Sequence, residues 1–454
     1  MGVPAGAAVA PAADATFVAS AVSIRTTTLG NGARIVTETL AQARSVSIGF
    51  WVGVGSRDEP REVAGASHFL EHLLFKGTDD HSASEIAEAV EAVGGEMNAF
   101  TAHEHTAYHA RLPAAELTLG LDLLAEVFTR PAFRVHEVEA ERQVILEELA
   151  MEEDSHEDRV LSLLADALFP GHPLGAEVLG TQETIETMTR DQIAAFHGRW
   201  YRPGNLVVAV AGALDHDQVV AGVERRLIGS EAGPAPVRHP PLAPAHALRV
   251  GTQRSEQVHL AVGLRAFSCR DDDRYALVLA NQVLGGGTSS RLFRTIREER
   301  GLAYSVWSDL SFYTDTGALV AAAATAPARV PDVLALVHGE LDHLLEAGVS
   351  DRELEVAKGY VVGSSLLSLE DSGSCMGRIA SDVLVHGEVR HLDEVLDRYR
   401  QVDASDVKRV VHRLAASGGR TLAVLGPLRR SRVEAMAGAA STPACSLPRA
   451  APLG

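Results

Sequence analysis

The sequence predicts an α+β fold made of two tandem homologous domains, and three observations support this. The chain has 454 residues, more than one ordinary hydrophobic core holds. A proline-rich stretch at residues 231–247 separates two parts of similar length. The two parts also share a sequence pattern, because residues 45–60 and 257–274 each predict a strand followed by a polar turn. We therefore expect one unit of mixed strands and helices to occur twice.

A second recurrence follows later in each part. Residues 133–145 and 348–362 both begin as a helix with acidic residues and continue into a valine-rich stripe. The expected organisation follows the order of the chain. It is a loose N-terminal tail at 1–24, a first domain at 25–230, a linker at 231–247, a second domain at 248–430 and a C-terminal tail at 431–454.

The composition excludes several classes of protein. A hydrophobic content of 46% and a charged content of 22% are typical of a soluble globular protein. No apolar run approaches the ~18 residues that span a membrane, so we expect no membrane partner. The net charge of −19 argues against nucleic acid and weakly favours basic peptides as partners. The three cysteines, Cys269, Cys375 and Cys445, are too scattered for a disulfide framework, which favours the cytoplasm.

The first candidate site lies in the helix predicted over SHFLEHLLFKGT, residues 67–78. His68, Glu71 and His72 share one stripe of a helix that is apolar nearly all round, as in a buried helix. Internal hydrogen bonds would satisfy a lone histidine on such a face. Two imidazoles one turn apart can instead converge on a single cation. The second part of the chain has no such motif, so we expect one metal site per chain.

The next segment, residues 94–112, alternates as a strand with polar residues on both faces. This pattern indicates an edge strand, which can add an extended peptide through main-chain hydrogen bonds. His103 and His105 share one face of this strand, and a second metal there is the alternative to ordinary polar surface.

A third metal ligand is expected in the helix predicted over residues 140–154. There Glu141 and Glu148 fall on the same stripe as two core-type residues, so they are not an ordinary solvated charge run. We predict Glu148 as the ligand and Glu141 as support for a ligating histidine, with Glu147 as the next candidate for the ligand. An ordinary run of solvent-exposed charges is a better interpretation of Glu147, Glu152 and Glu153 than of Glu141 and Glu148.

These motifs together resemble the pitrilysin or insulinase family of zinc metallopeptidases, whose inverted H-x-x-E-H motif is present as HFLEH. The resemblance is to the branch that contains mitochondrial processing peptidase and its bacterial relatives. It covers about residue 25 to about residue 425. It is carried by HFLEHLLFKGT, GGEMNAFTAHEHTAY, ERQVILEEL and GGGTSSRLFRTIREERGLAYSV.

The resemblance implies a fold in which each domain is a mainly antiparallel sheet packed with helices, the pair forming half of a clamshell. It implies one Zn²⁺ per chain, with the third ligand 76 residues after His72, at Glu148, and a supporting glutamate at Glu141. Glu71 is then the base that takes a proton from the zinc-bound water. The positions equivalent to Asn98, Ala99 and Phe100 line the cleft.

In the second domain the resemblance implies that Arg297 and Tyr304 steady the scissile carbonyl, although most such arginines are solvated or paired with neighbouring glutamates. The glycine-rich stretch at 285–287 lacks the GK[ST] ending of a nucleotide-binding loop, and its role stays open. Because longer members of the family join four such units, a homodimer is expected. Each active site would then be completed by Arg297 and Tyr304 of the partner chain.

The predicted function is a zinc endopeptidase that cuts extended or unstructured peptides inside an enclosed cavity. The alternative is a non-catalytic or partner-dependent scaffold subunit of the same fold. Because degenerate scaffolds tend to lose their metal ligands, the presence of His68, Glu71, His72 and Glu148 favours the enzyme.

Overall fold

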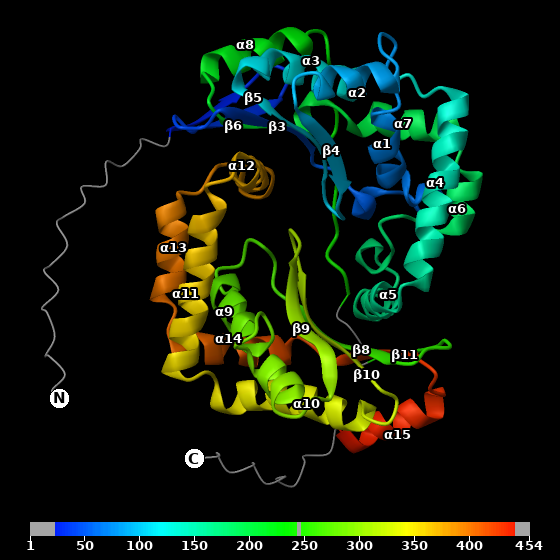
Figure 1. The fold of residues 1–454 in the computed structure, drawn as a ribbon, viewed down its shortest axis with the longest axis vertical. Helices are drawn as coiled ribbons and strands as arrows, with labels where there is room; N and C mark the ends of the chain where they lie inside the picture. Colours follow the sequence, from blue (N-terminus) through cyan, green and yellow to red (C-terminus); the bar gives the residue numbers. More distant parts are fainter. Residues whose placement is uncertain (1–22, 243–246, 441–454) are drawn as a thin grey trace, which may run out of the picture.

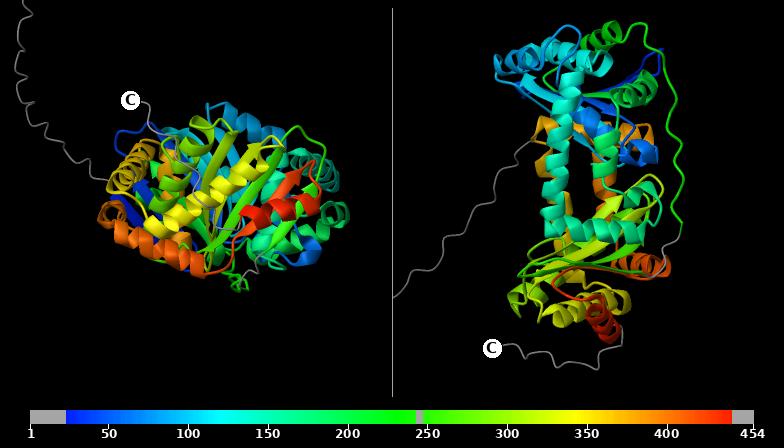
Figure 2. Two further views of the ribbon diagram at one scale, coloured as in Figure 1. Left: turned by 90° about the horizontal axis from the view of Figure 1, so that it is seen from below. Right: turned by 90° about the vertical axis from the view of Figure 1, so that its right-hand side faces the viewer.

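The computed structural model describes residues 23–242 and 247–440, which fold into two halves placed one above the other (Figure 1). The linker after α8 runs down one side of the molecule from the first half to the second (Figure 2). Residues 1–22 of the predicted N-terminal tail, part of the predicted linker, and the end of the predicted C-terminal tail with Cys445 lie outside the described residues. Residues 23 and 24, also predicted to belong to the tail, instead begin the first strand.

Each half is built on one sheet, and the two sheets share a five-strand plan, to which the first sheet adds one further strand at its edge. In the first, the strand order is β1-β2-β6-β3-β5-β4, and only the β2–β6 pair is parallel. In the second, the order is β7-β11-β8-β10-β9, and only the β7–β11 pair is parallel. The mainly antiparallel sheets and the duplication are therefore confirmed. The strands are β1 Ser23–Thr28, β2 Arg34–Thr39, β3 Ser45–Val52, β4 Glu96–Thr101, β5 Thr106–Pro113, β6 Leu206–Gly212, β7 Leu248–Thr252, β8 Val258–Ala266, β9 Ala303–Phe312, β10 Gly317–Thr325 and β11 Thr421–Gly426.

Helices cover both sheets, and many begin at a residue whose side chain caps the free backbone N–H groups. Ser82 and Ser350, for example, each accept from the backbone N–H three residues later in a capping box. The helices of the first half are α1 Ala66–Leu74, α2 Ala83–Glu91, α3 Leu117–Thr129, α4 Val135–Asp154, α5 His156–Leu168, α6 Gln182–Thr187, α7 Arg190–Trp200 and α8 His216–Arg226. Those of the second are α9 Arg274–Leu284, α10 Val330–Ala347, α11 Asp351–Ser368, α12 Ser372–His386, α13 Leu392–Gln401, α14 Ala404–Ala416 and α15 Arg430–Ala440.

Helix α15 occupies the start of the segment expected to be a loose tail, residues 431–454. The helix forms because Val433 is buried and Met436 packs against the core of the second half. This apolar spacing is short, and the surrounding residues are small and polar, so the sequence pattern did not distinguish it from a tail.

The two halves exchange a helix, which the sequence did not predict. Helix α12 comes from the second half but covers the first sheet, where Met376 and Ile379 pack against Trp51 and Val207. Helix α5 comes from the first half but covers the second sheet, where Leu164 and its neighbours pack against β8 and β11. Figure 1 shows α12 beneath the first sheet and α5 above the second. Each sheet is thus completed by the other half of the chain.

The segment at residues 94–112, predicted as one strand, is a hairpin of β4 and β5, so that prediction was wrong. The chain reverses at residues 102–105, where Ala102 N–H donates to the carbonyl of His105 at 2.8 Å. His103 and His105 consequently lie in a turn and not on one face of a strand. Of the two strands in this hairpin, only β4 lies at an edge of the sheet, because β5 pairs with both β4 and β3.

Candidate metal centre

Helix α1 carries the inverted motif, and a buried carboxylate fixes its start. Glu59 accepts from the backbone N–H groups of Gly65 at 2.7 Å and Ser67 at 2.6 Å, which no residue of the helix can satisfy. Burial raises the pKa of Glu59 to about 8, against the opposite effect of these two donors. The helix therefore begins at a defined position, at Ala66, two residues before His68.

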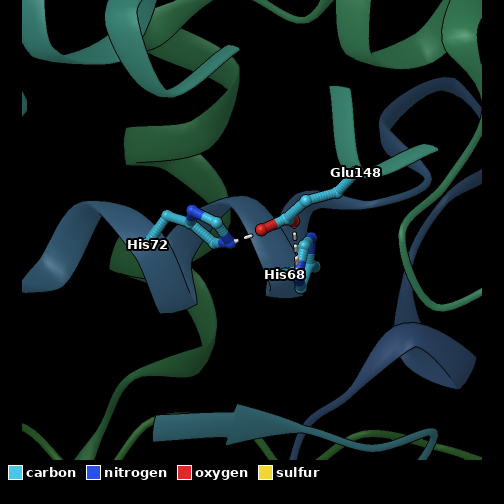
Figure 3. A group of neighbouring side chains, drawn as sticks. All are labelled: His68, His72 and Glu148. Carbon is cyan, nitrogen blue, oxygen red and sulfur yellow. Dashed lines mark ion pairs between the residues drawn. The ribbon is translucent and has the colours of Figure 1, made fainter. Parts of the chain in front are cut away.

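Three side chains from two helices converge beside α1 (Figure 3). The Nε2 atoms of His68 and His72 lie 3.6 Å and 3.4 Å from Oε2 of Glu148. The candidate ligand atoms of the three residues all lie within 4.8 Å of one another. Glu148 reaches the histidines from α4, which packs against α1. Glu147, the next candidate, is exposed and is not part of this group.

The arrangement fits a zinc ion better than it fits internal hydrogen bonds. The distances from Glu148 to the histidines exceed those of good hydrogen bonds, and they match the roughly 3.4 Å expected between two ligands of a tetrahedral zinc ion. Nδ1 of His68 is buried without a hydrogen-bond partner in the described part of the chain. Burial, with a smaller effect of His72, lowers the pKa of His68 to about 4. The imidazole is therefore neutral at pH 7, the form that binds metals.

Glu141 holds the second histidine in place. Its Oε2 lies 3.0 Å from Nδ1 of His72, and its Oε1 lies 2.7 Å from Nζ of Lys76. A hydrogen bond from Nδ1–H to this carboxylate leaves the lone pair of His72 Nε2 directed at Glu148. Lys76 was not identified from the sequence; it lies in the turn that follows α1, where helical spacing does not predict the direction of its side chain.

Glu71 lies beside the cluster without belonging to it. Burial raises its pKa, while hydrogen bonding to Thr101 and the nearby His72 act in the opposite direction. Thr101 is the last residue of β4, so the candidate base adjoins the end of the edge strand. Thr101 is a further site residue that the sequence analysis did not single out, since a lone threonine in a strand carries no signal.

The residues expected to line the cleft lie on this edge strand. Along β4 the side chains of Asn98 and Phe100 are exposed, and Ala99 is half-buried. Phe100 contacts Trp51 edge-to-face, with ring centroids 5.3 Å apart. The three residues thus lie on β4, an edge strand of the first sheet that packs against α1.

Arg297 and Tyr304 lie in the second half. Arg297 belongs to the π-helix Phe293–Glu298, and its guanidinium lies 4.5 Å from the ring centroid of Tyr304 on β9. Tyr304 is 78% exposed. In the described residues, neither side chain forms a hydrogen bond or ion pair with His68, His72 or Glu148. Arg297 and Tyr304 therefore contact each other, but they form no such interaction with the candidate metal ligands of the same chain.

The glycines at 285–287 have a packing role. A Cβ on Gly285 would lie 2.5 Å from the backbone nitrogen of Ser308 on β9, and one on Gly286 would lie 2.5 Å from the side chain of Gln282 on α9. The turn after α9 therefore passes too close to its neighbours for a larger residue.

A duplicated sheet-and-helix fold with two histidines and a glutamate around one point, and a free glutamate beside them, defines a protein of the zinc metallopeptidase class. Comparisons with known proteins agree. Residues 34–182 match the family described as Insulinase (Peptidase family M16), and residues 187–360 match the Peptidase M16 inactive domain. The chain belongs to peptidase family M16.

The relatives are named as zinc proteases. A protein of Mycobacterium leprae described as an uncharacterized zinc protease is 45% identical over 88% of this chain and 91% of its own length. Another so described, from Bacillus subtilis, is 37% identical over 86% of this chain and 95% of its own length.

Two solved structures share the fold. A protease from Helicobacter pylori has a TM-score of 0.83 at 25% identity and covers 89% of this chain and 99% of its own. A peptidase M16 inactive domain from Pseudomonas fluorescens has a TM-score of 0.85 at 21% identity and covers 90% of this chain and 98% of its own.

Among the described residues, no helix is both long and apolar enough to cross a bilayer.

Proposed function

We propose that this protein is a zinc-dependent endopeptidase that hydrolyses extended or unstructured peptides, with one zinc ion per chain. The observation that carries the proposal is the group of His68, His72 and Glu148. Glu71 lies next to this group on α1 and contacts Thr101 at the end of the edge strand β4. A zinc ion held there supplies Lewis-acid polarisation of a peptide carbonyl and lowers the pKa of water toward ~7.

The residues of the chain supply the remaining chemistry. The free edge of β4 pairs with the main chain of an extended peptide, and Asn98, Ala99 and Phe100 contact its side chains. Glu71 accepts a proton from the attacking water and passes it to the leaving amine. Burial raises the pKa of Glu71, which makes its carboxylate a stronger base than an exposed one. Glu141 keeps His72 oriented throughout.

Activity on unfolded chains is the direct test. Purified protein loaded with zinc should cleave an unstructured peptide rich in lysine and arginine and leave a stable globular protein of similar composition intact, because edge-strand pairing needs an extended backbone. A chelator should stop the cleavage and added zinc should restore it. Efficient digestion of the globular protein, or cleavage that survives complete zinc removal, would contradict the proposal.

We also infer a homodimer, because Arg297 and Tyr304 do not meet the metal centre of their own chain. In a dimer, each site would be completed by these two residues of the partner chain.

The cytoplasm is the inferred location, which suits the absence of disulfides among the described cysteines.

Complementation tests the shared site. Glu71→Gln and Tyr304→Phe chains should each be nearly inactive alone. When they are mixed under conditions that let subunits exchange, each heterodimer that forms should have up to about half of the activity of a wild-type dimer. A heterodimer then concentrates both defects in one site and leaves the other site intact, and independent sites add. Mixing Glu71→Gln chains with His72→Ala chains is the control, since both changes affect the same half and no intact site can form. No recovery in the first mixture despite proven exchange would refute the shared site.

A further inference from the structure

A mostly apolar cavity of about 180 Å³ lies between α5 and the β9–β10 hairpin. An engineered apolar cavity of about 150 Å³ in another protein holds a benzene molecule, so this space can take a side chain the size of leucine or phenylalanine. Its walls include Leu164, Phe169, Trp307, Tyr313, Val320 and His103. No residue of the metal centre lines it.

Both halves of the molecule form the cavity. Helix α5 and His103 belong to the first half, whereas Trp307, Tyr313 and Val320 lie on or next to β9 and β10 of the second. Burial lowers the pKa of His103 to about 4, so the histidine presents an uncharged ring that contacts Tyr313, with ring centroids 5.6 Å apart. Asp309, an exposed residue of β9, is the acidic residue in the lining of the cavity.

A buried ionic network holds the two turns beside the cavity in a fixed position. Arg57, whose side chain is 2% exposed, binds both carboxylate oxygens of Asp315 at 2.9 Å and 2.6 Å. Glu104 bonds Arg57 at 2.5 Å and accepts from the backbone N–H of Thr314 at 2.9 Å. The β4–β5 turn of the first half is thereby bound to the β9–β10 turn of the second, and the cavity exists before any ligand arrives.

The cavity continues the path of the edge strand. Thr101, where β4 ends, lies beside Glu71, and His103 follows only two residues later. Because an extended chain advances about 3.3 Å per residue, a peptide paired with β4 that passes Glu71 reaches His103 within about two to three further residues. This cavity, which His103 lines, is an apolar space within that reach.

We propose that this cavity is a substrate subsite that binds one apolar side chain, of leucine or phenylalanine size, a few residues from the scissile bond. The subsite rests on the proposed endopeptidase function. It gives the second half, which lacks metal ligands among its described residues, a direct role in selecting the peptide.

The test uses decapeptides of serine, alanine and lysine in which one leucine is moved through the sequence, with the cleaved bond located by mass spectrometry. At one position relative to that bond, leucine should raise kcat/KM about tenfold or more over alanine, the range for an apolar side chain in a pocket. Val320→Phe fills the cavity and should reduce this ratio to about one. Val135→Phe, the same change at an exposed position on α4, should leave the ratio unchanged.

A second variant guards against a folding defect in the first. Val320→Ala enlarges the cavity and should shift the preference at the same position from leucine toward phenylalanine. Binding of the peptides to Glu71→Gln protein should show the same order of affinities without any cleavage. Cleavage with no leucine preference, or a preference that survives Val320→Phe, would overturn the subsite while leaving the peptidase intact. If the wild type cuts none of the peptides and Glu71→Gln protein binds none, the proposed function fails and the subsite fails with it.

Discussion

Replacement of Glu71 by glutamine is expected to reduce peptide hydrolysis by at least about 100-fold while the protein keeps its zinc. Glutamine has the shape of glutamate but cannot accept a proton from the attacking water. Glu71 also lies outside the group of three candidate ligands, so its loss should not release the metal. The measurements are kcat/KM on an unstructured peptide and the zinc content per chain by atomic absorption.

Three further variants separate chemistry from metal binding. His72→Ala and Glu148→Gln should lose both zinc and activity, because each removes a ligand. Glu147→Gln is the matched control, since it makes the same change on the exposed side of α4 and should alter neither quantity. An active Glu71→Gln enzyme would remove Glu71 from the mechanism, and full zinc occupancy in Glu148→Gln would move the third ligand to another residue.

Replacement of Arg57 by methionine is expected to lower the free energy of unfolding by about 3 kcal/mol or more. Methionine fills much of the volume but leaves the carboxylates of Glu104 and Asp315 without their main cationic partner in a largely buried place. Unpaired buried charges are far more costly than exposed ones. The measurement is equilibrium unfolding in denaturant, followed by tryptophan fluorescence.

The control is Arg25→Met, which breaks the ion pair with Asp217 at the surface. The two side chains of that pair are 50% and 74% exposed, so the change should cost less than about 1 kcal/mol. Arg57→Lys should fall between the two, because an ammonium group cannot bind both oxygens of Asp315 in the same planar way. A loss for Arg57→Met no larger than that for Arg25→Met would show that the network contributes little to stability.

The grouping of His68, His72 and Glu148 could be predicted from the sequence in part because the residues on each helix repeat with its period. His68 and His72 are one turn apart, and Glu141 and Glu148 are two turns apart, so each pair had to share a face whatever the surrounding fold. The edge position of β4 was also indicated, by polar residues on both faces of the segment.

Other features depend on contacts between distant residues, and no local pattern reveals these. The reversal at residues 102–105 contains no glycine, proline or asparagine, so the hairpin looked like one strand. Arg57 meets Glu104 and Asp315, which follow it by 47 and 258 residues. An amphipathic pattern shows that α5 and α12 bury one face, but it does not show which sheet they cover.

The exchange of α5 and α12 also sets an order of events during protein synthesis. A ribosome completes β6, the last strand of the first sheet, at Gly212, but α12 begins only at Ser372. Until then the face of the nascent sheet that carries Trp51 and Val207 has no helix to cover it, and α5 has no second sheet to lie on. Exposed apolar faces of this kind attract chaperones and favour aggregation. The halves consequently cannot be made as two separate well-packed proteins by cutting the chain at the linker, although their sheets share one strand order.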